Sequence, residues 1–296
     1  MIKIPSRSEI KDALGWYRLA QKFKAGDPYH WWQRGAVGEY QEGKKTLFNQ
    51  GLFEESSTAK ERLGTKRELD DGRVYRYAGI TAAAITASGA LLSKAQTAVA
   101  ATIAAADALI DLVGAREITL TIAGATADLY KDGELVVKAG TDIGSKYKVR
   151  GNVVTGNPAA GRAVVSLYDK LFVTWVAAST TIGAYQSPFK NLLINPAVAS
   201  VGTGTAGEHV MGMSIRPITA SYYAWLQTRG IAALVLDVAA AAGDQDYEAQ
   251  IIPGPTSGRG ALVAAGPVSG HQSIGELVAM TVRTTAEACL VYLTIE

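Results

Sequence analysis

Cysteine and histidine are scarce in this sequence of 296 residues. Cys289 is the single cysteine, so no disulfide can form within the chain. The histidines, His30, His209 and His271, lie far apart and with one cysteine cannot supply the ligands of a typical zinc cluster. We therefore expect no metal site. The strand-like sequence around Cys289 predicts a small buried hydrophobic residue and not a nucleophile.

Charged residues are also scarce, at 19% of the chain, where about a quarter is usual. The hydrophobic share of 48% excludes a wholly disordered chain. The charges are spread unevenly: residues 1–76 hold 15 Lys and Arg and 11 Asp and Glu, whereas residues 77–296 hold 14 and 16. The total of +2 therefore averages a charged, basic N-terminal quarter and a charge-poor remainder rich in Ala, Gly, Thr and Val.

Hydrophobic runs long enough to cross a membrane are missing. Charged residues follow the first positions, where a secretory signal would have its apolar core. The uncharged stretch from Leu171 to Phe189 contains several Ser and Thr residues and Pro188, so it reads as strand, loop and strand and not as a membrane span. We expect a soluble protein that is made in the cytoplasm and has no membrane partner.

Helical periodicity is convincing only in residues 6–24. Ser6 and Glu9 have the spacing of a capping box, and apolar residues recur at helical intervals from Ile10 to Tyr17. A Gly-Asp-Pro sequence then ends the pattern. The sequence therefore predicts one short N-terminal helix.

The chain that follows this helix is both aromatic and charged, and it shows no sustained period of 2 or 3.6. Such a segment cannot easily bury its aromatic side chains against itself, so it packs either on its own subunit or on a neighbouring protein. Interfaces are rich in aromatic residues and arginine, which favours the neighbouring protein. The candidate partner-binding residues are Trp16, Tyr17, Tyr29, Trp31, Trp32, Arg34, Tyr40, Phe48 and Phe53.

Beyond Gly72 the sequence consists of short β-type runs separated by turn residues. Residues 73–77 and 117–122 alternate, and Asp132-Gly133 has the composition of a hairpin turn between 129–130 and 135–137. The Ala-rich run 95–112 could be a helix by propensity, but its β-branched residues favour extended structure. Further strands are expected at 146–150, 162–168, 171–177, 222–228, 231–238, 248–252 and 289–295.

No long helical pattern separates these strands, so an antiparallel β architecture is preferred over a doubly wound α/β fold. The predicted fold is mainly β: an N-terminal arm with one helix over residues 1–76, followed by two antiparallel β modules of sandwich or barrel type. The first module covers residues 77–187, a Pro- and Gly-rich linker covers 188–207, and a barrel-like C-terminal module covers 208–296.

Motifs for catalysis or cofactor binding lack their structural context. Residues 202–207 match the dinucleotide pattern G-x-G-x-x-G, but no convincing helix follows and Gln227 stands where an acid is needed, so we prefer a loop. Asp244, Asp246 and Glu248 alternate as metal ligands on a strand could, but the Gly and Glu of a calcium loop are missing, so we prefer a solvated turn. We expect no enzyme and no cofactor.

A nucleic-acid partner is not expected either. The 15 basic residues of the N-terminal segment are interspersed with 11 acids, and they form no continuous basic stripe.

Several stretches resemble a family of tailed-bacteriophage virion proteins that decorate or cement the capsid shell. The resemblance covers roughly residues 50–296 in pieces and consists of turn and strand signatures. These signatures lie at residues 63–77, 130–135, 143–152, 218–230, 274–277 and 290–295.

The resemblance implies a β-rich, non-enzymatic structural protein of the virion, located on the capsid surface. Its partners would be the major capsid protein and further copies of itself, in a dimer or trimer. Two alternatives stay open. One is a tail or fibre protein that binds host glycans through tryptophans such as Trp31, Trp32, Trp175 or Trp225, and the other is a virion-associated hydrolase that uses the three acids between 244 and 248.

Overall fold

The computed structural model describes residues 40–41, 44–95, 98–103, 113–155, 162–175, 180–195, 208–237, 250–254, 256–262, 272–279 and 287–296. Contacts divide the chain into two units, residues 1–52 and 53–296. In the first unit, β1 (Tyr40–Gln41) and β2 (Lys44–Leu47) pair antiparallel. The helix predicted at 6–24 lies outside the described residues. The described part of the chain holds strands and turns and no helix, so the prediction of a mainly β protein is confirmed.

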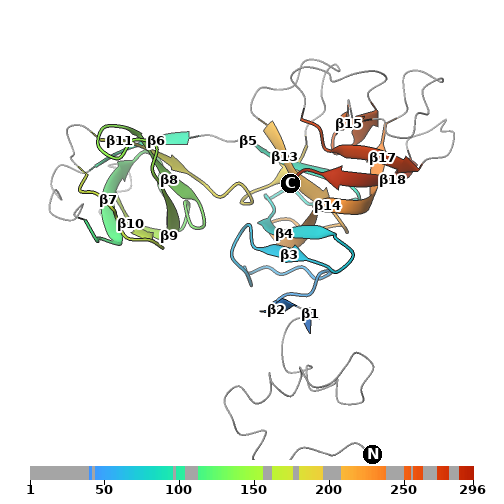
Figure 1. Ribbon diagram of the computed structural model, residues 1–296, viewed down its shortest axis with the longest axis horizontal. Coiled ribbons are helices and arrows are strands. Elements are labelled where there is room, and N and C mark those ends of the chain that lie inside the picture. Colours follow the sequence, from blue (N-terminus) through green and yellow to red (C-terminus); the bar gives the residue numbers. More distant parts are fainter. Residues whose placement is uncertain are drawn as a thin grey trace, which may run out of the picture. The chain divides into compact units, whose positions relative to one another are not determined.

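Six strands of the second unit close into an antiparallel barrel (Figure 1). Around this six-stranded barrel the order is β10-β7-β6-β11-β8-β9, and every neighbouring pair is antiparallel. The strands are β6 (Ala98–Ile103), β7 (Glu117–Ile122), β8 (Glu134–Ala139), β9 (Lys146–Val154), β10 (Arg162–Leu167) and β11 (Thr181–Tyr185).

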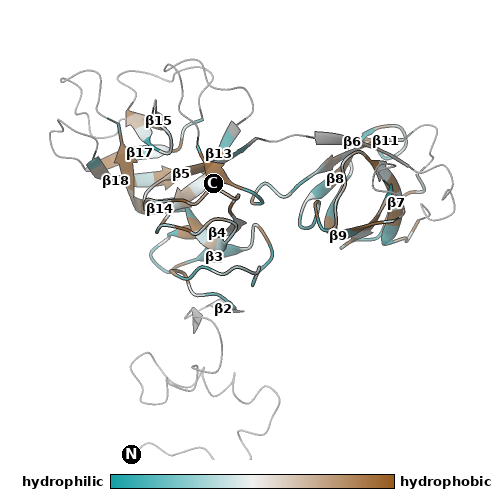
Figure 2. Ribbon diagram, turned by 180° about the vertical axis from the view of Figure 1, so that it is seen from behind, coloured by the Kyte–Doolittle hydropathy of each residue, from teal (hydrophilic) through white to brown (hydrophobic). Residues whose placement is uncertain are grey.

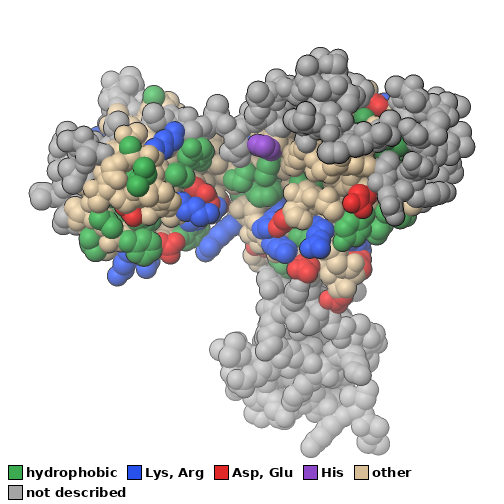
Figure 3. Space-filling model, turned by 45° about the horizontal axis from the view of Figure 1, so that its top comes forward, with side chains coloured by type: hydrophobic (Ala, Val, Ile, Leu, Met, Phe, Trp, Pro, Cys, Tyr) green, Lys and Arg blue, Asp and Glu red, His purple; other side chains and the backbone are tan. Residues whose placement is uncertain are grey.

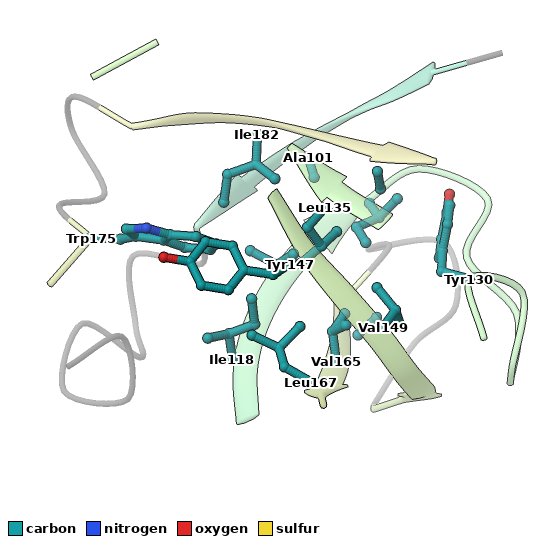
Figure 4. Close-up of a cluster of buried hydrophobic side chains, with 14 of the residues drawn as sticks. Ala101, Ile118, Tyr130, Leu135, Tyr147, Val149, Val165, Leu167, Trp175 and Ile182 are labelled. Carbon is teal, nitrogen blue, oxygen red and sulfur yellow. The ribbon is translucent and has the colours of Figure 1, made fainter. Parts of the chain in front are cut away.

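The alternation of the sequence accounts for this barrel, because successive side chains of a strand point to opposite faces. In β10, for example, Ala163, Val165 and Leu167 are buried, whereas the residues between them are half-buried. The inward side chains form one apolar core. Figure 4 shows the rings of Tyr147 and Trp175 on one side of this core, and Tyr130 on the other.

The other ten strands form a second sheet in the order β12-β5-β13-β14-β16-β15-β17-β18, with β4 on β14 and β3 on β4. Because β14 also pairs with β18, strands β14, β16, β15, β17 and β18 follow one another in a closed circuit, which we call the C-terminal ring. It encloses much of a second apolar core. The strands are β3 (Lys66–Glu68), β4 (Val74–Gly79), β5 (Leu91–Ala95), β12 (Leu193–Ile194), β13 (Glu208–Ser214), β14 (Tyr223–Leu236), β15 (Gln250–Pro253), β16 (Gly260–Leu262), β17 (Gly275–Ala279) and β18 (Glu287–Thr294).

The longest strand, β14, replaces the two strands expected at 222–228 and 231–238. Its first half pairs with β4 and its second half with β18, and the register shifts between Gln227 and Arg229. Gly230 has a left-handed φ of 88°, and a side chain there would press on Arg73. A glycine inside a strand often marks a bend. Gly230 lies where β14 passes from its pairing with β4 to its pairing with β18.

The order of pairing differs from the order of the chain. β5 precedes the six-stranded barrel and β12 follows it, yet both belong to the second sheet, so the barrel is an insertion in that sheet. β3 and β4 also join this sheet, although the expected division ends the arm at residue 76. The segment expected as linker, 188–207, contains β12 in its described part.

Two local predictions are wrong. Asp132-Gly133 closes no hairpin: residues 127–132 are turns, because the N–H groups of Leu129 and Gly133 bond to the carbonyls of Thr126 and Tyr130. The buried Asp132 carboxylate accepts the backbone N–H of Leu63 (3.2 Å) and the hydroxyl of Tyr168 (3.3 Å). Residues 171–175 form no strand, since Leu171 and Trp175 project into the barrel core from a loop.

Other local predictions are confirmed. The Ala-rich run is extended over residues 98–103, and its residues 96–97 and 104–112 lie outside the described part. Cys289 is a buried residue of β18 with 5% of its surface exposed, as its surroundings predict. Strands also occur near 73–77, 117–122, 146–150, 162–168, 248–252 and 289–295.

Candidate functional site

Three large apolar side chains are exposed at one end of the six-stranded barrel. They are Val113, Ile143 and Phe172, with 61%, 68% and 69% of their surfaces exposed. Each comes from a different loop, and none belongs to a strand. We call these three residues the apolar end of the barrel. Exposed apolar groups that lie together, unlike single ones, mark interaction sites.

Backbone and side-chain hydrogen bonds bring the three loops together. The Gly114 N–H donates to the Leu171 carbonyl, and the Leu171 N–H donates to the Ala115 carbonyl, both at 2.9 Å. These bonds place Val113 and Phe172 on neighbouring segments. The third loop is tied in through the hydroxyl of Tyr147.

The Tyr147 hydroxyl accepts the N–H of Phe172 at 3.4 Å and donates to the Asp142 carboxylate at 2.6 Å. The same carboxylate accepts the Ser145 hydroxyl at 2.5 Å. Asp142 has a left-handed φ of 72° and directly precedes Ile143. The hydrogen bonds of one tyrosine therefore set the positions of both Ile143 and Phe172.

Aromatic rings fill the base of the apolar end. Tyr147 packs edge-on against Trp175 with ring centres 5.4 Å apart (Figure 4). It also packs, with tilted rings, against Phe172 at 5.7 Å. Burial, and then the hydrogen bond to Asp142, raise the pKa of Tyr147 to about 12. Burial acts to raise the pKa of Asp142, but the hydrogen bonds from Ser145 and Tyr147 lower it overall. At neutral pH the carboxylate is charged and the phenol keeps its proton.

Charged residues flank the apolar residue of each loop in the sequence. Arg116, Glu117, Lys146, Asp169 and Lys170 are exposed, and both signs occur. An apolar centre with a polar, solvated rim is the composition of a protein–protein interface.

A second candidate is a cleft of about 960 Å³ that the barrel shares with residues of the second sheet. Figure 3 shows basic and acidic side chains around this hollow. Many of these charges hold the fold together: Arg76 pairs with Glu296, and the guanidinium of Arg62 lies 4.5 Å from the ring centre of Tyr168. These charged side chains have partners within the fold, so we assign them a structural role and prefer the apolar end as the functional site.

Lys94 in β5 has a perturbed pKa, which often indicates a functional group. It is 8% exposed, and its ammonium donates to the Gln186 side chain (3.2 Å) and to the carbonyls of Ser187 (3.1 Å) and Lys190 (2.6 Å). Burial, and the nearby charge of Lys190, lower its pKa to about 8. These acceptors lie where the chain leaves the barrel, so Lys94 ties the strand before the barrel to the segment after it.

The structure describes three of the nine predicted partner-binding residues. Phe48 is buried, Phe53 is 60% exposed, and Tyr40 belongs to β1. The other residues of that set, Trp16, Tyr17, Tyr29, Trp31, Trp32 and Arg34, lie outside the described residues.

The structure also describes some of the residues on which the alternative functions depend. Trp175 and Trp225 are 2% and 0% exposed, so neither can stack on a glycan. Residues 202–207, the acids between 244 and 248, His30 and His271 lie outside the described part of the chain, and His209 is exposed. Within the described ranges no three His, Cys, Asp or Glu side chains are grouped to hold a metal ion, and no helix could span a membrane.

The sequence does not single out the apolar end. Phe172 stands in an apolar run that reads as a buried strand, and exposure depends on how that run packs. The one sequence signal is the turn chemistry around Ile143, since Asp142 and Gly144 both adopt left-handed φ.

Comparisons with protein-family models, with curated proteins and with solved structures give no match for this chain.

Proposed function

We propose that the chain is a non-enzymatic structural protein of a bacteriophage virion, which decorates or cements the capsid by binding the lattice of its major capsid protein. The observation that carries the proposal is the apolar end of the six-stranded barrel, where Val113, Ile143 and Phe172 are mostly exposed. A monomeric soluble protein has little reason to keep three such residues on loops that its own hydrogen bonds hold together.

The distribution of polar chemistry supports the same proposal. The buried polar groups that could suggest catalysis hold the fold: Asp132 ties the barrel to Leu63, and Lys94 ties β5 to the segment after the barrel. Each of these two side chains bonds to the backbone and to one further side chain, as buried polar groups in structural networks do. A decoration protein needs a stable body and a contact surface, and this arrangement supplies both.

The N-terminal arm provides the second part of the attachment. Contacts assign residues 1–52 to a unit of their own, and this unit holds most of the aromatic and basic residues predicted to bind a partner. An extended segment can cover a large surface of a neighbour, although it loses entropy when it orders there. Because a lattice repeats, modest contacts from many copies suffice.

The glycan-binding alternative loses two of its four tryptophans, because Trp175 and Trp225 are in the cores. A panel of sugars should therefore leave the tryptophan fluorescence of the full chain unchanged. Quenching by one class of sugar would favour the tail or fibre function instead.

Co-sedimentation with capsids that lack the protein tests the proposal. Phe172→Asp places a charge at the centre of the apolar end, and we expect it to lower capsid occupancy at least tenfold. Val153→Asp is the matched control, since Val153 is 63% exposed on β9, away from these loops, and should leave occupancy unchanged. Deleting residues 1–39 leaves every described residue in place and should also abolish attachment. Normal occupancy of both Phe172→Asp and the deletion variant would contradict the proposal.

A further inference from the structure

The C-terminal ring has an apolar outer face. Along β14, β17 and β18 the outward positions carry Ile231, Ala233, Val235, Val278, Ala288, Leu290 and Tyr292. Ile231, Leu290 and Val278 are 43%, 42% and 38% exposed. Their neighbours in the same strands are buried in the ring, so these strands are apolar on both faces. Strands with that pattern are normally covered on both faces.

The outer face is continuous across the three strands. Ile231 lies opposite Tyr292, and Ala233 lies opposite Leu290, in the antiparallel register of β14 and β18. On the other side of β18, Leu277 lies opposite Val291, which places Val278 beside the same stripe. Figure 2 shows hydrophobic colouring around β18, whereas hydrophilic residues recur along the strands of the six-stranded barrel.

Two charges of opposite sign flank this face. Arg229 is exposed on β14, opposite Thr294 of β18, and Glu276 is exposed on β17, opposite Tyr292 of β18. Neither side chain has an ion-pair partner among the described residues. Since β18 lies between β14 and β17, the two charges sit on opposite sides of the apolar stripe, one row apart.

We infer that this outer face binds the same face of a second copy of the chain. When one copy is turned over about an axis along β18 and laid on the other, β14 of each copy lies over β17 of its partner. Arg229 of each copy then lies near Glu276 of the other, one row further along the strands, and the apolar stripes meet between these two pairs of opposite charges. A two-fold contact requires a self-complementary surface of this kind.

The face is small for a protein–protein interface. Three strands about 4.8 Å apart and about five residues long cover roughly 250 Å². This is about a third of the roughly 800 Å² that each partner contributes to a standard interface. An interface of this size is typical of weak, transient contacts, so we expect the dimer at micromolar or higher concentration and more readily between copies held side by side on a surface.

Sedimentation velocity of the full chain, from low to high micromolar concentration, tests the inference. The wild-type protein should shift from monomer to dimer. Leu290→Lys should weaken dimerisation more than about tenfold, because it buries a charge in the stripe. Val153→Lys, at an exposed valine of the six-stranded barrel, should leave the dimer intact, and circular dichroism should show both variants folded.

A charge exchange distinguishes this specific contact from nonspecific hydrophobic association. Arg229→Glu and Glu276→Arg should each weaken self-association, because like charges then face each other. An equimolar mixture of the two variants should dimerise as the wild type does, because the acidic pair of one variant lies over the basic pair of the other. A wild-type protein that stays monomeric throughout, or a mixture that associates no better than either variant alone, would overturn the inference and leave the face to a different partner.

Discussion

The six-stranded barrel and the C-terminal ring are both closed β structures with apolar interiors, but their outer surfaces differ. Outward positions of the barrel carry seven charged residues: Glu117, Glu134, Lys138, Lys146, Lys148, Arg150 and Arg162. The corresponding face of β14, β17 and β18 is apolar between Arg229 and Glu276. The strands of the barrel therefore have a polar outer surface, and we propose that the barrel makes its contacts through loops, whereas the ring makes them through its strands.

Because the six-stranded barrel and the second sheet have separate cores, we expect each to respond to its own tryptophan. Trp225 is fully buried against the edge of Tyr77 (5.2 Å) and beneath Arg67 (5.6 Å), and Trp175 packs on Tyr147. Trp225→Ala and Trp175→Ala should each cost about 3–5 kcal/mol of stability. Urea unfolding followed by near-UV circular dichroism should show two transitions, with each variant lowering a different one. A single transition that both variants lower equally would make the barrel and the second sheet one cooperative unit.

Glycines at close backbone contacts allow the stability of the barrel and that of the ring to be compared by single small substitutions. A Cβ at Gly133 would collide with the carbonyls of Tyr185 and Tyr130, and one at Gly275 with the carbonyl of Tyr292. Gly133→Ala should destabilise the barrel, and Gly275→Ala the ring, each by about 3 kcal/mol. Gly114→Ala is the control: the site is open but φ is 89°, so we expect a loss of about 1 kcal/mol. Equal losses at Gly114 and Gly133 would show that backbone strain, and not the close contacts, limits these sites.

The connection between barrel and sheet should depend on pH through Lys94. Its pKa in the folded protein is about 8, lowered from 10.5 by burial, so the folded protein releases this proton at lower pH than the unfolded chain does. The cost of burying the charge is then relieved as pH rises from about 8 to 10.5, and stability should increase by about 1–3 kcal/mol over that window. Lys94→Met should remove this increase. A difference in unfolding free energy between wild type and variant that stays constant from pH 7 to 11 would show that Lys94 does not cause the pH dependence.

The smallest expected effects distinguish a change in folding stability from a change in self-association. Ile231→Thr on the ring and Val153→Thr on the barrel change exposed residues, so each should alter stability by less than about 0.5 kcal/mol. Only Ile231→Thr should weaken self-association. Thermal unfolding and sedimentation of the same samples measure both quantities. A loss of association with Val153→Thr would remove the distinction between the two surfaces.

Much of the strand content could be predicted from the sequence, because alternation is a local property. β7 occupies Glu117–Ile122 as its polar and apolar residues indicate, and β10 and β18 also follow their patterns. The pairing could not be predicted. β4 pairs with β14, which lies some 150 residues further along the chain, and nothing local in Val74–Gly79 specifies that partner.

The contact surfaces depend on tertiary structure even more. Phe172 and Trp175 stand in the same apolar run, yet one is 69% exposed and the other 2%. The difference arises because Leu171 and Trp175 fill the barrel core while the Phe172 backbone is held outside by Tyr147. Likewise, the apolar run of β18 reads as a buried strand, and only its place in the ring shows that one face is uncovered.

An electron cryo-microscopy reconstruction of particles decorated with this protein tests the central claim most directly. The account predicts density for the six-stranded barrel with the loops of Val113, Ile143 and Phe172 on the capsid shell. It also predicts that the outer faces of two C-terminal rings meet about a two-fold axis. A map in which the loops of the barrel point to solvent, or in which no density for the chain lies on the shell, would contradict it.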